Sequence, residues 1–220
     1  MSFRVLFRDE LRGFYKSKVM MFLWVGLPLM AVLVYLWSPE TEPEMPLAAF
    51  SALLLSSIGG TLASVMLAVS IINEKDRKVY DLFLIRPIKR RNILLSKFFA
   101  VYLCLVIAGL IALGFGILVD YIYIGGTPDV ILENALESVV LTLSMMAIAS
   151  SAGILIGVVS PSVLLGAIIV IYGGNQISIV PMLPKMMGLE HEVLFSILFS
   201  LVISGALLWL SVFIFDRKQF

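Results

Sequence analysis

The sequence contains six long segments without a single Asp, Glu, Lys, Arg or His side chain. They run over residues 19–37, 47–72, 98–119, 138–159, 162–182 and 193–215. The hydrocarbon core of a bilayer is about 30 Å thick, and roughly 20 apolar residues in a helix cross it. Ser160-Pro161-Ser162 separates the fourth segment from the fifth, because proline interrupts a continuing helix. We therefore predict an all-α membrane protein whose six transmembrane helices form one domain over residues 1–220.

The composition supports a lipid environment. Apolar residues make up 60% of the chain and charged residues only 14%, with a mean hydropathy of +1.05. A soluble domain of this length needs more polar side chains to cover its surface. No long acidic or basic block is present, so a nucleic-acid partner is not expected.

The basic residues are sorted to one side of the predicted spans. Of the 16 Lys and Arg residues, 15 precede the first span, lie between the second and third, or follow the last, and only Lys185 falls on the other side. Short loops rich in Lys and Arg stay in the cytoplasm. We expect a multi-pass protein of a prokaryotic plasma (inner) membrane, with both termini cytoplasmic.

The first 18 residues predict an amphipathic helix at the cytoplasmic surface. Apolar and basic residues recur every three or four positions, which places them in two stripes along a helix. The residues concerned are Phe3, Phe7, Leu11 and Phe14, and Arg4, Arg8 and Arg12. Such a helix lies in the membrane interface with its basic stripe near lipid headgroups. The sequence leaves two interpretations of this helix open: a simple anchor that follows the positive-inside rule, and a dedicated mechanical role.

Small residues recur at four-residue spacing in the second and fourth spans. The two series are Ala52, Ser56, Gly60, Ser64 and Ala68, and Ala149, Gly153 and Gly157. Small side chains let helix backbones approach closely in lipid. Packing within the chain is the favoured reading, and a subunit interface is the alternative.

The sequence lacks the residues of the common enzyme sites. The one cysteine, Cys104, cannot form a disulfide within the chain, and the one histidine, His191, has no second histidine four residues on for a zinc pair. No G-x-x-x-x-G-K-[ST] loop is present to bind nucleotide phosphates. We expect a chain that is not an enzyme and has no catalytic residue, metal or cofactor of its own; any ATP and Mg²⁺ would bind to a partner subunit.

The connection between the second and third spans, residues 73–97, combines charged and apolar residues. Its charged start, apolar centre and proline predict a short amphipathic helix that docks to a soluble protein. The residues expected to make this contact are Glu74, Asp76, Arg77, Asp81, Leu82, Phe83, Arg86 and Pro87. A solvated loop is the alternative, but it would not need the apolar cluster.

This connection resembles that of the ATP-binding-cassette (ABC) type 2 transporter permeases. Their pattern is E-[RK]-[ED]-x-G-T-x-E-x-L-L-x-x-P-I, followed by a lysine that opens the third span. The residues that carry the resemblance are Glu74, Lys75, Asp76, Asp81 at the Glu position, Leu82 just before the Leu-Leu positions, Pro87, Ile88 and Lys97, whereas Lys78-Val79 replaces the Gly-Thr pair. The order of N-terminal helix, six spans and one long inner loop is also similar to that family.

The resemblance implies a permease, and we expect it to belong to an exporter. Two such subunits, identical or different, would form the translocation path in lipid, and two ABC ATPase subunits would drive them through a coupling helix at residues 74–88. Two alternatives remain open: a haem-exporter permease of cytochrome c maturation, and a membrane scaffold or channel that uses no ATP.

Polar residues interrupt the fifth predicted span in its outer half. Tyr172, Asn175 and Gln176 surround a Gly-Gly pair there. Polar groups at this depth prefer protein or water to lipid, so these residues are candidates for the translocation path. An asparagine bonded across a helix interface is the competing explanation.

Overall fold

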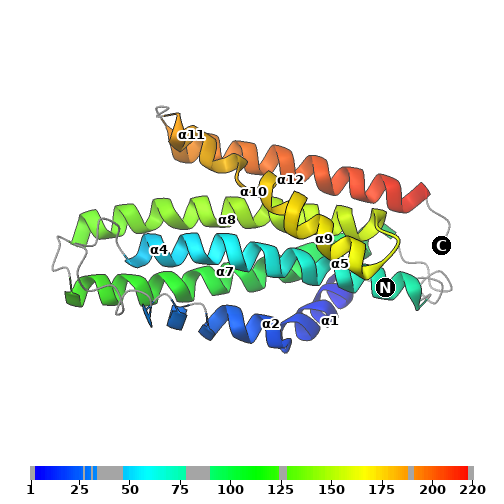
Figure 1. Ribbon diagram of the computed structural model, residues 1–220, viewed down its shortest axis with the longest axis horizontal. Helices are drawn as coiled ribbons and strands as arrows, with labels where there is room; N and C mark the ends of the chain where they lie inside the picture. The colour runs from blue at the N-terminus through cyan, green and yellow to red at the C-terminus, as the bar shows by residue number, and fades with distance from the viewer. Residues whose placement is uncertain are drawn as a thin grey trace.

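The computed structural model describes residues 3–26, 28–30, 32–33, 47–77, 90–123, 128–187 and 191–217. All regular structure in these ranges is helical, as the sequence predicts for the fold class. Figure 1 shows long helices lying side by side, with a short N-terminal helix beneath one end of the bundle.

The N-terminal region forms a helix, a sharp turn and a second helix. α1 spans Phe3–Tyr15, and α2 (Lys18–Met21) continues into the π-helical turn η1 (Phe22–Gly26). Ser17 separates α1 from α2, because its hydroxyl accepts a hydrogen bond from the backbone N–H of Met20 at 3.2 Å and so caps the new helix.

Four long helical rods form the body of the part that the structure describes. The first combines α4 (Leu47–Leu54), the π-helical turn η2 (Leu55–Gly59) and α5 (Gly60–Asp76). The others are α7 (Arg90–Tyr123), α8 (Pro128–Val159) and α12 (Glu192–Arg217).

A segmented helix lies between α8 and α12. It comprises α9 (Val163–Ile169), η3 (Val170–Gly174), α10 (Asn175–Ser178), η4 (Val180–Met182) and α11 (Leu183–Met186). Ser160-Pro161-Ser162 separates α8 from α9, and the Ser162 hydroxyl caps α9 by accepting from the Leu165 N–H at 3.4 Å. The helix is therefore interrupted at the proline, where the sequence suggested a break.

Five helices in the described part are long and apolar enough to cross a membrane. They are Phe50–Asp76, Arg91–Ile122, Ala135–Val159, Val163–Met182 and Glu192–Arg217. The first predicted span, 19–37, is described as a shorter apolar helix over Lys18–Met30, and residues 34–46 lie outside the described ranges. The multi-span helical fold is confirmed, and the sixth crossing stays a prediction.

α8 is the central helix of the bundle. It packs against α5, α7 and α12, and 67% of its most apolar stretch is buried, compared with 17% for α12. Burial therefore decreases outward from α8, and the α9–α11 segment and α12 turn most of their apolar surface away from the protein. A membrane supplies the solvent that such a surface requires.

The two series of small residues pack against each other. A Cβ added to Gly153 would lie 2.5 Å from the Ser64 carbonyl oxygen, and one added to Gly157 would lie 3.0 Å from the Ala68 Cα. Closer to the middle of the bundle, Gly60 faces Ala149. The favoured interpretation of both series was packing within the chain, and it is correct. At this contact α5 and α8 approach almost backbone to backbone.

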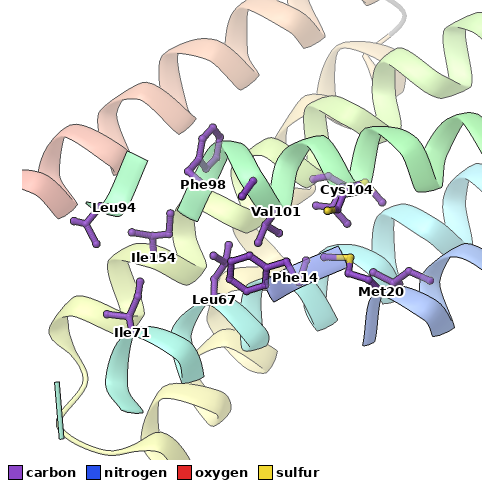
Figure 2. Close-up of a cluster of buried hydrophobic side chains, with 14 of the residues drawn as sticks. Phe14, Met20, Leu67, Ile71, Leu94, Phe98, Val101, Cys104 and Ile154 are labelled. Atoms are coloured by element: carbon purple, nitrogen blue, oxygen red, sulfur yellow. The ribbon is translucent and has the colours of Figure 1, made fainter. Parts of the chain in front are cut away.

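The end of the bundle that holds α1, the last turns of α5 and the first turns of α7 is called here the basic end. Figure 2 shows Phe14 of α1 reaching into the apolar core, near Leu67 of α5 and Val101 of α7. Because Phe14 is only 8% exposed, α1 is anchored to the bundle by its own core residue.

α12 contacts the bundle through a face of serines that the sequence reading did not single out. Ser196, Ser200, Ser204 and Ser211 are buried along this face. The Ser204 hydroxyl donates to the Ser200 carbonyl at 2.6 Å and that of Ser211 to the Leu207 carbonyl at 2.7 Å. These bonds satisfy the Ser204 and Ser211 hydroxyls within α12, whereas the Ser196 hydroxyl also donates to the Pro181 carbonyl at 2.7 Å. The small side chains on this face let α12 lie close to α8.

The α5–α8 contact predicts a strong effect of one added methyl group. Gly153→Ala should lower the stability of the protein by about 1–3 kcal/mol, because the new Cβ meets backbone that can yield only if the helices separate. Gly114→Ala in α7 is the matched control, since no heavy atom lies within 4 Å of its added Cβ. Thermal unfolding in detergent should separate the two variants, and equal midpoints would contradict the close packing.

Candidate functional site

One lysine at the basic end is buried and holds two carboxylates from different helices. The Lys97 side chain on α7 is 1% exposed, and its Nζ lies 2.8 Å from Glu10 Oε1 and 2.6 Å from Glu74 Oε1. Glu10 belongs to α1 and Glu74 to the last turn of α5. A single ammonium group therefore joins three helices that are far apart in the sequence.

Ser70 and Phe14 complete the surroundings of this ammonium group. Lys97 Nζ donates to Ser70 Oγ at 3.2 Å, and the Ser70 hydroxyl donates to Glu74 Oε1 at 3.2 Å. The Phe14 ring centroid lies 5.8 Å from Nζ, within the range of a cation–π contact. The three donor positions of the ammonium are thus directed at three oxygen atoms.

Helical spacing places these groups on facing surfaces. Ser70 and Glu74 are four residues apart on α5, and Leu6, Glu10 and Phe14 follow the same spacing on α1. Leu6 and Phe14 are buried on either side of Glu10, so the carboxylate sits in the middle of an apolar contact face. We call Glu10, Ser70, Glu74 and Lys97 the ion cluster.

Burial raises the pKa of the Glu10 carboxyl above its ordinary value of 4.5, although the charge and hydrogen bond of Lys97 oppose the shift. Because the folded-state pKa is the higher one, the folded protein binds a proton at Glu10 more readily than the unfolded chain does. The resulting stabilisation is complete below the unfolded pKa and is lost as the pH rises through the folded pKa.

A second lysine ties α5 to α8 at the same end. Lys75 Nζ donates to the carbonyl of Ser160 at 2.9 Å and to that of Val158 at 3.2 Å. These carbonyls lie at and just beyond the C-terminus of α8, where the helix leaves carbonyl groups without intrahelical partners and favours a cation. Neighbouring residues 74 and 75 therefore fasten the end of α5 to α1, α7 and α8.

The predicted docking residues that the structure describes include one that points inward and two that are exposed. Glu74 points into the ion cluster, whereas Asp76 and Arg77 are exposed at the end of α5. The remaining predicted contact residues lie outside the described ranges: Asp81, Leu82, Phe83, Arg86 and Pro87. Their role stays a prediction.

The predicted interfacial helix is present as α1, with a buried face that differs in part from the one expected. Phe3, Phe7 and Leu11 are half-buried, Phe14 is buried, and Arg4, Arg8 and Arg12 are exposed. The most buried apolar positions, Leu6 and Phe14, face α7. Glu10 was not expected at the site; an acidic residue between Leu6 and Phe14 on one helix face is the signal that could have found it.

The candidate path residues occupy a different part of the fold. Tyr172 belongs to the π-helical turn η3 and is 76% exposed, and Gln176 of α10 is also exposed. Asn175 begins α10, and its side chain is outside what the structure describes. In Figure 1 this segment lies beside α8 and apart from α1, so the structure does not bring the path residues to the ion cluster.

The fold and the site define a multi-span membrane protein whose helices are bound together by charged groups at one end. Residues 10–176, about three quarters of the chain, match the family described as ABC-2 family transporter protein. The chain belongs to this family and is a membrane component of an ABC transporter. A search of curated proteins gave no match. The family match includes Glu10, Glu74 and Lys97, so the ion cluster lies within the shared region.

The ion cluster predicts that loss of the lysine charge is costly. Lys97→Met should destabilise the protein by about 3 kcal/mol, because two carboxylates remain at a site with no cation between them. The matched control is Lys18→Met, which removes an exposed lysine and should change the unfolding midpoint little.

A rescue experiment separates charge from packing. Combining Lys97→Met with Glu10→Gln and Glu74→Gln removes the unpaired carboxylates and should restore much of the lost stability. Thermal unfolding in detergent measures all three variants. If the triple variant is no more stable than Lys97→Met, the charge balance of the cluster is not what holds the three helices.

Proposed function

We propose that this chain is the permease subunit of an ATP-driven exporter. Two such subunits form the translocation path, and separate ATPase subunits bind ATP and Mg²⁺ on the cytoplasmic side, which is the basic end. Family membership supports the general role, and residues 1–220 contain no nucleotide-binding loop, which fits a motor on a separate chain.

The observation that carries the mechanical part of this proposal is the contact of Lys97 with Glu10 and Glu74. α5 ends at Asp76 and α7 begins at Arg90, so these two helices flank the predicted coupling segment. A force applied to that segment reaches both helices, and the ion cluster extends it to α1. Lys75 extends it further to the end of α8.

The charged residues at the end of α5 then have two separate roles. Glu74 is directed inward and transmits displacement, and Lys75 does the same towards α8. Asp76 and Arg77 are exposed and are available to the ATPase subunit. The sequence extends this docking surface through Asp81, Leu82, Phe83, Arg86 and Pro87.

The exposed residues of the α9–α10 segment support a path formed between two subunits. Tyr172 and Gln176 carry polar groups on the outside of a single chain, where lipid would leave those groups without partners. A second permease subunit that faces this segment would enclose the polar groups of Tyr172, Asn175 and Gln176 in a polar path. The predicted spans carry no charged residue, which suits an amphipathic or lipid-like cargo.

Site-directed cross-linking tests the ATPase contact. The permease carrying Asp76→Cys is purified from its native membrane with its associated proteins and treated with a bifunctional thiol reagent. We expect a cross-link to a co-purifying protein that contains a Walker nucleotide-binding motif. Native Cys104 is fully buried and contributes little background.

The control places the same thiol at the opposite end of the bundle. His191 is exposed at the start of α12, away from α5's end, so His191→Cys should give no cross-link to the ATPase. Equal cross-linking from both positions, or a cross-link from His191→Cys alone, would contradict the proposed docking side.

A further inference from the structure

A groove lies between α1 and α5, next to the ion cluster. Its volume is about 620 Å³, within the range of roughly 300–1,000 Å³ that is typical of small-ligand sites. α1 and the turn after it contribute Asp9, Glu10, Arg12, Phe14 and Lys16, and α5 contributes Met66 and Ser70. The groove therefore combines charges of both signs with an apolar floor.

Three of the charged groups in this groove form no ion pair with another residue that the structure describes. Glu10 is bound to Lys97, but in the described ranges Asp9, Arg12 and Lys16 have no ion-pair partner. Arg12 in the last turn of α1 and Lys16 in the turn after it both line this groove. Two cations and one carboxylate remain to bind a ligand, which favours a phosphate group with an amine beside it.

The surroundings indicate that this ligand is a membrane lipid. Directly after the groove, α2 and η1 expose Met21, Phe22 and Val25, which marks the beginning of an apolar outer surface. Tyr15 at the end of α1 stacks edge-on against Trp24, with ring centroids 4.9 Å apart. Tyr and Trp concentrate at the level of lipid headgroups. The groove thus opens where a headgroup meets its acyl chains.

We propose that this groove binds the headgroup of an amine-bearing glycerophospholipid. The phosphate lies between Arg12 and Lys16, the amine lies at Asp9, and one acyl chain leaves along Met21 and Val25. Met66 and Phe14 form the apolar floor beneath the glycerol group. The bound lipid fills the space between α1 and α5 and so supports the position of α1. This site is independent of the ATPase contact proposed above.

The chain contains a matched control for the phosphate contact. Arg12→Gln/Lys16→Gln removes two charges that line the groove, and Arg4→Gln/Arg8→Gln removes two exposed charges of the same helix that do not. Native mass spectrometry of the purified protein with phosphatidylethanolamine measures the bound lipid. We expect affinity to fall about tenfold or more for the first variant and less than about twofold for the second. Equal losses, or no loss for the first variant, would overturn the site.

The amine contact and the lipid origin of the phosphate are tested separately. The wild-type protein should prefer phosphatidylethanolamine to phosphatidylglycerol, and Asp9→Asn should abolish this preference; an unchanged preference would overturn the role of Asp9. Glycerophosphoethanolamine, which has no acyl chain, should compete poorly with the whole lipid. Competition at equal concentration would show that the groove takes a soluble phosphate compound and would overturn the lipid assignment.

Discussion

The charge of Lys97 is the constraint on which the basic end of this protein depends. A buried ammonium group is costly unless it is paired, and here two carboxylates and a hydroxyl surround it. Such a cluster adds little net stability compared with an apolar core, but it specifies which helices meet and where. α1 is bound in one position relative to α5 and α7, and the groove beside it exists because α1 is held there.

The second constraint is the close approach of α5 to α8. Gly153 and Gly157 leave no room for a side chain at this contact, and Lys75 closes it at the basic end. Tightly packed helices move together and transmit displacement rather than absorbing it. α1, α5, α7 and α8 therefore form one connected body, and α12 and the α9–α11 segment lie around it.

The fold class followed from the lengths of the apolar segments, and the packing role of the small-residue series followed from their spacing. Which series faces which could not be predicted, because one-dimensional spacing does not identify the partner helix. Glu10 was missed for a related reason: on a helix rich in charge, an acidic residue looks solvated until a buried lysine from another helix is brought to it. Lys97 was noticed only as part of a family pattern, since its partners are 23 and 87 positions away in the chain. The serines of α12 were overlooked because single serines in an apolar span do not show which helix they face, and Ser204 and Ser211 bond to their own helix.

The central claim is that Lys97 makes α1 and α5 a single mechanical unit, and distances between spin labels test it most directly. Labels on Arg8→Cys and Asn73→Cys, both exposed, report the separation of the two helices in the complex of permease and ATPase subunits, with and without ATP. We expect one narrow distance distribution that ATP does not change, and a broad one when Lys97→Met is introduced. A distance that shifts with ATP while Lys97 is intact would contradict the claim.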